Sequence, residues 1–120
     1  MKVVVADDSR AMRMIVIRTL RQAGYDGVDV IECENGAAGL AQVVAVSPDL
    51  VLSDWNMPGM NGIEFLQALR ASGNQVPFGF VTSEGSDAMR ATAEESGALF
   101  LIAKPFTADM FAEALKPVLG

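Results

Sequence analysis

The chain has 120 residues, of which 51% are apolar, so it can form one packed domain and is too hydrophobic for a disordered chain. Nine basic and fifteen acidic residues give a net charge of −6, which argues against a nucleic-acid surface, because such a surface needs a basic stripe. The absence of histidine removes the commonest general base and transition-metal ligand, so carboxylates are the densest reactive groups.

Sequence features also bear on location. The longest unbroken apolar runs fall well short of the ~20 residues that a membrane span needs. The chain enters a strand-like run directly after Met1-Lys2, without the pattern of an export signal. Cys33 is the only cysteine, which excludes an internal disulfide and suits a reducing compartment. We therefore expect a cytoplasmic protein that binds neither membrane nor nucleic acid, and we expect a monomer.

Five short apolar runs alternate with helix-length segments along the chain. The runs, each predicted to be a strand, are Lys2–Ala6, Val28–Cys33, Leu50–Ser53, Phe78–Thr82 and Leu99–Ala103. They are almost continuously apolar, which is typical of parallel strands buried on both faces. Gly79 is unexpected within the fourth run, because glycine weakens the interior of a strand.

The intervening segments have the periodicity of amphipathic helices. Between Ser9 and Ala23, one face is predicted to be buried: Met12, Ile15, Val16, Thr19, Leu20 and Ala23. The last segment has an equivalent face: Met110, Phe111, Ala114, Leu115 and Val118. Gly24 and Gly97 are expected to end the first and fourth helices. The repeated alternation predicts one doubly wound α/β domain over residues 1–120, with right-handed crossovers.

The carboxyl ends of the predicted strands are where an open α/β sheet binds its ligands. Asp7 and Asp8 follow the first strand, and Asp54 follows the third. Thr82 ends the fourth strand, and Lys104 follows the fifth. Three carboxylates, a hydroxyl and an ammonium group are therefore expected at one edge of the sheet, whereas the second strand leads into an ordinary turn.

These groups suit phosphoryl chemistry. Three neighbouring carboxylates repel one another and need a cation, and oxygen ligands suit Mg²⁺. Asp54 is the candidate nucleophile, which would form an aspartyl phosphate. Lys104 would stabilise charge on the phosphoryl oxygens, and the Thr82 hydroxyl would donate a hydrogen bond to them.

Each residue also has an ordinary structural interpretation. Asp8 could cap the first helix, and Asp54 or Thr82 could be turn residues. Lys104, which precedes a proline, could be a solvated loop residue. The functional interpretation is favoured because all of these residues fall at the same ends of the strands.

Four motifs resemble the signature of bacterial response-regulator receivers. They are Asp7-Asp8-Ser9, Asp54-Trp55-Asn56-Met57-Pro58-Gly59-Met60-Asn61-Gly62, Thr82-Ser83-Glu84 and Lys104-Pro105-Phe106. The resemblance covers residues 1–119 and is nearest to stand-alone chemotaxis regulators of the CheY type. It implies a flavodoxin-like (βα)5 sheet of order 2-1-3-4-5 and a phosphorylation-controlled switch of a two-component system.

The resemblance also implies roles for individual residues. A histidine kinase or a histidine phosphotransfer protein would phosphorylate Asp54. Asp8, the Asp54 side chain and the Asn56 carbonyl would bind Mg²⁺, with Asp7 acting through water and charge. Thr82 would be the switching hydroxyl, and the peptide bond before Pro105 would be cis. A downstream protein would bind the face formed by the fourth helix, fifth strand and fifth helix, and the chain would be a self-dephosphorylating phosphoacceptor rather than an enzyme with external substrates.

Two further sets of residues are assigned by the resemblance. Asn56 and Glu84 are expected to tune hydrolysis of the phosphorylated form, and their small or polar character predicts fast loss. The first helix has an outer face that is expected to dock the phosphodonor: Arg10, Met14, Ile17 and Arg21. The alternative is an ordinary solvated helix with incidental apolar residues.

The sequence departs from the chemotaxis pattern at the switch. Leu101 stands where an aromatic residue is expected, and residues 86–96 are more acidic than in motor-binding regulators. The phosphoryl chemistry is expected to survive, but binding to a flagellar motor is not predicted. Activation is expected to alter the loop 83–86 and the start of the fourth helix, with Leu101 changing rotamer little.

Two alternatives remain open. A haloacid-dehalogenase-type phosphatase also uses an aspartate nucleophile with Mg²⁺, but it needs a second aspartate where Ser9 stands, and 120 residues leave little room for a substrate cap. A degenerate receiver would bind partners without being phosphorylated.

Overall fold

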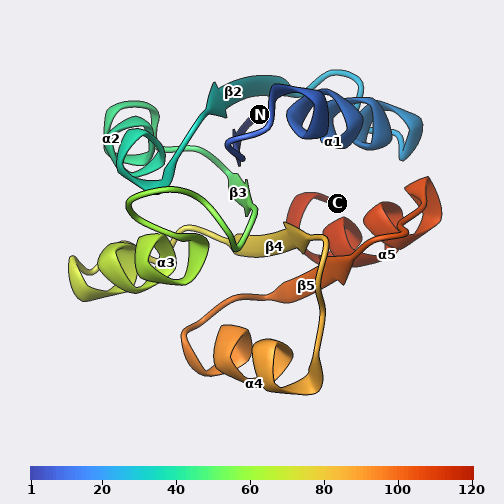
Figure 1. The fold of residues 1–120 in the computed structure, drawn as a ribbon. Coiled ribbons are helices and arrows are strands. Elements are labelled where there is room, and N and C mark those ends of the chain that lie inside the picture. The colour runs from blue at the N-terminus through green and yellow to red at the C-terminus, as the bar shows by residue number, and fades with distance from the viewer.

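The computed structural model describes residues 1–120 as five strands and five helices that alternate along the chain (Figure 1). In chain order they are β1 (Lys2–Ala6), α1 (Arg10–Gln22), β2 (Asp29–Cys33), α2 (Gly36–Val46), β3 (Leu50–Ser53), α3 (Gly62–Ala71), β4 (Phe78–Thr82), α4 (Asp87–Glu95), β5 (Phe100–Ala103) and α5 (Ala108–Leu119). The strands are parallel in the order β2-β1-β3-β4-β5. The predicted doubly wound fold and its strand order are therefore confirmed.

Helices cover both faces of the sheet, with α1 and α5 on one face and α2, α3 and α4 on the other (Figure 1). Each face has its own hydrophobic cluster, the first centred on Phe65, Leu66 and Leu69 and the second on Leu20, Phe111 and Leu115. β3 and β4 are buried along their whole length, which explains their continuously apolar sequences. None of the helices is long and apolar enough to span a membrane.

The two edge strands differ from the prediction. β2, an edge strand, begins at Asp29 rather than Val28, and its Asp29 and Glu32 are exposed. β5 begins at Phe100, and Leu99 is 58% exposed. The expectation of strands buried on both faces therefore holds for the centre of the sheet and not for its edges.

The predicted buried face of α1 is wrong at Ile15, which is 41% exposed. The helix instead turns Arg13 inward, beside the buried Met12 and Val16. Met110 of α5 is likewise exposed. The predicted ends of α1 and α4 are confirmed, since Gly24 and Gly97 adopt φ values of 102° and 99° directly after the C-terminal caps.

Gly79 of β4 has a physical explanation in its neighbour on β5. Gly79 is paired in register with Phe100, and a Cβ atom at Gly79 would overlap the Phe100 ring. The missing side chain therefore makes space for an aromatic ring from the edge strand to lie across the sheet.

Candidate functional site

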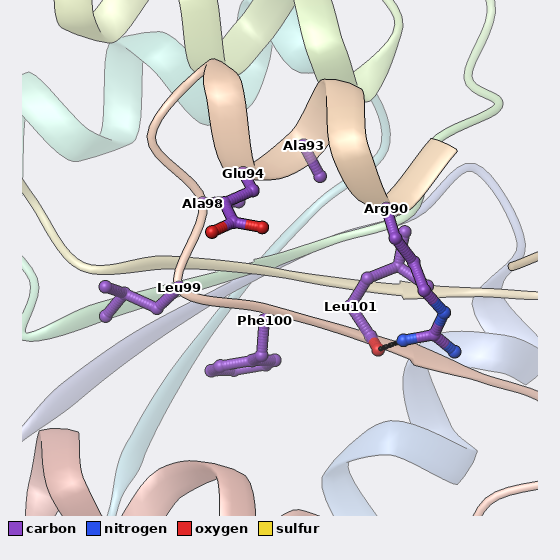
Figure 2. Close-up of a pocket in the computed structure, with 7 residues that line it drawn as sticks. All are labelled: Arg90, Ala93, Glu94, Ala98, Leu99, Phe100 and Leu101. Carbon is purple, nitrogen blue, oxygen red and sulfur yellow. Dashed lines mark hydrogen bonds between the residues drawn. The ribbon is translucent and has the colours of Figure 1, made fainter. Parts of the chain in front are cut away.

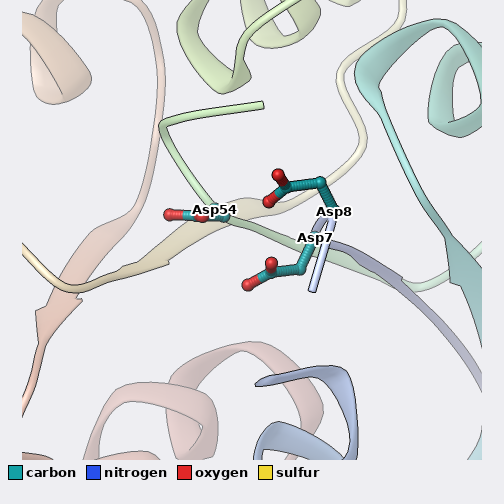
Figure 3. A group of neighbouring side chains, drawn as sticks. All are labelled: Asp7, Asp8 and Asp54. Carbon is teal, nitrogen blue, oxygen red and sulfur yellow. The ribbon is translucent and has the colours of Figure 1, made fainter. Parts of the chain in front are cut away.

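The three predicted carboxylates meet at the carboxyl ends of β1 and β3. These strands are adjacent and parallel, with Ala6 opposite Ser53, so the residues that follow them become neighbours. One carboxylate oxygen each from Asp7, Asp8 and Asp54 lies within 4.8 Å of the other two. Figure 3 shows the three side chains gathered above the strand ends.

Asp7 and Asp8 differ in burial and in their hydrogen bonds. Asp7 is buried, and its Oδ1 accepts a hydrogen bond from the Ser9 N–H at 2.9 Å. The cap of α1 is Ser9, whose Oγ accepts from the Met12 N–H at 3.2 Å. Asp8 is exposed and is not used as the cap, so its carboxylate is available to a ligand.

Burial makes the ionised carboxylates unfavourable. It raises the pKa of Asp7 to about 6, where the Ser9 N–H opposes the shift and the charges of Asp54 and Asp8 add to it. Burial also raises the pKa of Asp54, against hydrogen bonds from the Trp55 N–H, the Thr82 hydroxyl and the Asn56 N–H. The Trp55 N–H lies 2.7 Å from Asp54 Oδ1. A cation bound between these groups would relieve the cost of their charges.

Thr82 and Lys104 reach the same place from β4 and β5. Thr82 is fully buried, and its carbonyl accepts a hydrogen bond from the Lys104 N–H at 3.0 Å. The Lys104–Pro105 bond is cis, as the resemblance implies. Lys104 and Ser83 line a cavity of about 180 Å³ together with the three aspartates, Ser9 and Met12.

The remaining predicted site residues lie outside this cavity. Asn56 is exposed on the loop after Asp54 and does not line the cavity. Glu84 is also exposed, and its N–H donates to Thr82 Oγ1 at 3.4 Å. Leu101 is buried among the side chains under α4.

The loop after Asp54 is held by two glycines that the sequence analysis did not single out. The Gly62 N–H donates to the Trp55 carbonyl at 2.8 Å, and a Cβ atom at Gly62 would overlap the Asp54 carbonyl oxygen. A Cβ atom at Gly36 would lie 2.7 Å from the Met60 carbonyl oxygen. The backbone from Asp54 through the loop that follows it is therefore fixed by close approaches that only glycine permits.

Arg13 is a second feature that sequence reasoning missed. Its Nη1 donates to the Asp7 carbonyl oxygen at 2.6 Å, and its Nε donates to Glu32 Oε1 of β2 at 2.9 Å. An arginine on an amphipathic helix is ordinarily expected in solvent, and the only available signal was its place next to the buried Met12.

The predicted docking residues form one groove along α1. The groove has a volume of about 400 Å³ and is lined by all four of them, together with Arg18 and Glu32: Arg10, Met14, Ile17, Arg18, Arg21 and Glu32. α1 carries no acidic residue, so the arginines of this groove outnumber its one glutamate and make it basic within an acidic protein.

A second groove, of about 440 Å³, lies between α4 and β5 (Figure 2). Arg90 crosses one end of it and donates from Nη1 to the Leu101 carbonyl at 2.8 Å. The loop after β4 packs beside this contact, because a Cβ atom at Gly85 would lie 2.7 Å from Ala103 Cβ and 3.2 Å from Arg90 Nη2. Arg90 thus connects α4 and the loop to the backbone of β5.

The comparisons with known proteins agree with this geometry. Residues 3–116 match the family model described as the response regulator receiver domain. The chain belongs to this family. Chemotaxis protein CheY1 of Helicobacter pylori is 40% identical over 123 residues, which cover 100% of this chain and 98% of that protein. A CheY homolog of Campylobacter jejuni is 40% identical over 124 residues, covering 100% of this chain and 93% of that protein.

Solved structures of receiver domains and CheY proteins have the same fold as this chain. Chemotaxis protein CheY4 of Vibrio cholerae aligns with a TM-score of 0.84 and 33% identity, covering 98% of both chains. The receiver domain of NarL from Mycobacterium tuberculosis aligns with a TM-score of 0.85 and 31% identity, covering 97% of this chain and 93% of that one. The protein is a CheY-like receiver domain of a two-component response regulator.

The acidic cluster of this receiver fits a magnesium ion. Its family binds Mg²⁺ at an acidic pocket, and the three carboxylates here offer oxygen atoms within 4.8 Å of one another. No histidine or thiol belongs to the cluster, so its donors suit a hard cation rather than a transition metal.

Proposed function

We propose that this receiver is a signalling switch that accepts a phosphoryl group on Asp54 with the help of Mg²⁺. The observation that carries the proposal is the cluster of Asp7, Asp8 and Asp54, whose cavity also includes Lys104. Asp8, the Asp54 carboxylate and the Asn56 carbonyl would bind the ion, with Asp7 acting through water and charge. The phosphodonor would be a histidine kinase or a histidine phosphotransfer protein.

In the proposed reaction, an oxygen of the ionised Asp54 carboxylate attacks the phosphorus of a phosphohistidine. The new oxygen–phosphorus bond forms as the phosphorus–nitrogen bond breaks, and the imidazole leaves with the electron pair of that bond. When bound, Mg²⁺ would neutralise charge on the phosphoryl oxygens. Lys104 would neutralise a further oxygen, and Thr82 would donate its hydroxyl proton to a third in a hydrogen bond.

Phosphorylation by a small phosphodonor tests this assignment. We expect the parent protein to be labelled by acetyl phosphate only with Mg²⁺, and beryllofluoride to change Trp55 fluorescence under the same condition. Asp54→Asn should lose the label, because an amide is a poor nucleophile. Asp8→Asn should retain it at higher Mg²⁺ concentrations. Undiminished labelling of Asp54→Asn would contradict the proposal, and a parent that takes no label would indicate a degenerate receiver.

The proposed chemistry includes loss of the phosphoryl group to water without a substrate outside the protein. Asn56 and Glu84 are exposed on the loops that follow Asp54 and Thr82. Their size and polarity support fast hydrolysis, as a transient signal requires. The chain would therefore be a phosphoacceptor with self-phosphorylation and self-dephosphorylation activity, and not an enzyme acting on other molecules.

The basic groove of α1 is the proposed docking surface for the phosphodonor. Met14 is 53% exposed within it, and its arginines would meet acidic residues of the donor. Met14→Glu combined with Ile17→Lys should slow transfer from the kinase and leave labelling by acetyl phosphate unchanged. An equal loss with both donors would indicate misfolding instead of lost docking.

The output is proposed to pass through α4, β5 and α5 to a downstream protein. Grooves on both sides of β5 leave Leu99 and Phe100 accessible there. The CheY names of its relatives support a chemotaxis pathway, with the chain acting as a monomer in the cytoplasm. Thr82 would transmit the signal through the loop 83–86, whereas Leu101 would change rotamer little.

A further inference from the structure

Arg13 is the only basic residue in the buried set, and the proposed chemistry does not use it. Its side chain is 8% exposed, and burying a guanidinium group is unfavourable unless its donors are satisfied. Glu32 satisfies the Nε donor, but Glu32 is half exposed on an edge strand. The shorter of the two contacts is the one from Nη1 to the carbonyl oxygen of Asp7.

That carbonyl belongs to the peptide group that joins Asp7 to Asp8. Because a peptide group is planar and rigid, a bond that fixes its oxygen also fixes the direction in which the chain continues to the Cα atom of Asp8. Two other contacts fix this turn: the Asp7 N–H donates to the Cys33 carbonyl at 3.0 Å, and the Asp7 carboxylate accepts from the Ser9 N–H at 2.9 Å, which closes a turn around Asp8. Neither of these contacts holds the carbonyl of the peptide between Asp7 and Asp8, which accepts its hydrogen bond from Arg13.

Orientation matters here because the three carboxylates repel one another. Asp8 is exposed, so its side chain could reduce the repulsion by turning into solvent. A charge-assisted hydrogen bond at 2.6 Å is strong enough to resist movement of the backbone that carries it. Glu32, held on β2, completes the support by fixing the guanidinium plane from the other side.

We infer that Arg13 is a positioning residue for the cation site, holding the Asp7–Asp8 peptide so that the Asp8 carboxylate faces Asp54. The inference rests on the proposed binding of Mg²⁺. Arg13 touches neither the ion nor the phosphoryl group, and acts through the backbone of Asp7. Outer contacts of this kind typically change metal affinity by about 10- to 100-fold.

The test is Mg²⁺ affinity, titrated by Trp55 fluorescence at a temperature where each variant is folded by circular dichroism. Arg13→Met keeps an unbranched side chain but removes every donor, and should bind Mg²⁺ at least about tenfold more weakly. Arg13→Lys keeps one donor for the Asp7 carbonyl and should recover part of the loss. The control, Glu32→Gln, can still accept from Nε and should remain within about twofold of the parent.

Two results would overturn the inference. One is an Arg13→Met variant with a lower unfolding midpoint in chelator but parental Mg²⁺ affinity, since that is the behaviour of a purely structural residue. The other is a Glu32→Gln variant that loses as much Mg²⁺ affinity as Arg13→Met. The loss of affinity would then come from the Arg13–Glu32 contact between α1 and β2, and not from the hydrogen bond to the Asp7 carbonyl. A parent that fails to bind Mg²⁺ would overturn the proposed function itself and is recognised without any variant.

A measurement on the parent decides the matter if Arg13→Met does not fold. The Nε–H resonance of Arg13 in a nitrogen-15 spectrum should shift during the Mg²⁺ titration, with the same midpoint as Trp55 fluorescence. An Arg13 resonance that stays unchanged at saturating Mg²⁺ would show that the guanidinium group is not coupled to the site.

Discussion

α1 and α4 pack against opposite faces of the same sheet, but they are held very differently (Figure 1). α1 buries five residues: Met12, Arg13, Val16, Thr19 and Leu20. α4 buries only Ala93. Elements with few buried contacts open locally at lower free energy than the rest of a protein. The helix beside the acidic cluster is therefore a rigid support, whereas the helix of the proposed output surface can shift without disturbing the core.

The largest expected difference between the two helices is in stability. Leu20→Ala in α1 should lower the free energy of unfolding by about 3 kcal/mol, because Leu20 is almost fully buried and the cavity cannot collapse. Met89→Ala in α4 should cost about 1 kcal/mol, since Met89 only borders its hydrophobic cluster. Urea unfolding of both variants measures the difference. Equal losses would show that α4 is held as firmly as α1.

A second prediction concerns the negative charge of the buried Asp7 carboxylate beside α1. The pKa of Asp7 is about 6 in the folded protein, against an ordinary value of 3.8 for an aspartate, so ionisation disfavours folding. This penalty develops as the pH rises from about 4 to 6 and is complete above that window. Without Mg²⁺, Asp7→Asn should therefore be more stable than the parent at pH 7.5 by about 2 kcal/mol, with little difference near pH 4.

Thermal or urea unfolding in chelator across this pH range measures the effect. Asp109→Asn is a suitable control, because Asp109 is exposed in the first turn of α5, far along the chain from the cluster. A stabilisation of Asp7→Asn that stays constant between pH 4.5 and 7.5 would contradict the titration of Asp7 as its cause.

The smallest effect is expected at the contact between Arg90 and the Leu101 carbonyl. Arg90→Ala removes the hydrogen bond that ties α4 to β5, so amide exchange in residues 87–95 should become about fivefold faster, with little change in α1. The matched control is Arg18→Ala, since Arg18 is an exposed arginine of α1 whose side chain makes no hydrogen bond or ion pair. Hydrogen exchange by mass spectrometry measures both. Unchanged amide exchange in α4 would show that the Arg90 hydrogen bond does not hold α4 against β5.

Much of the fold could be predicted from sequence because its central strands are dictated by burial. β3 and β4 are covered on both faces, so their apolar runs identified them without ambiguity. The site followed from the rule that parallel strands end at one edge, which brought Asp7, Asp8 and Asp54 together. The roles assigned to these residues remain predictions, because they depend on ligands and partners.

What the sequence could not predict depends on pairs of residues that are distant in the chain. Arg13 is buried where Ile15 was expected to be, and Ile15 is exposed. The reason is that Glu32 and the Asp7 carbonyl accept hydrogen bonds from the buried arginine. Periodicity within one helix contains no information about such partners. Gly79 was unexplained for the same reason, since its purpose depends on Phe100 across the sheet.

The close approach of the chain at Gly62 predicts how a mutation at this position would act. Because the carbonyl of Asp54 occupies the space where a side chain at position 62 would begin, the smallest possible enlargement there, to alanine, must displace the backbone of Asp54. A single-base change in the gene would in this way disturb the acidic cluster, and with it the proposed signalling, while leaving every acidic residue intact. Loss of signalling in a mutant strain that retains Asp7, Asp8 and Asp54 should therefore direct attention to position 62.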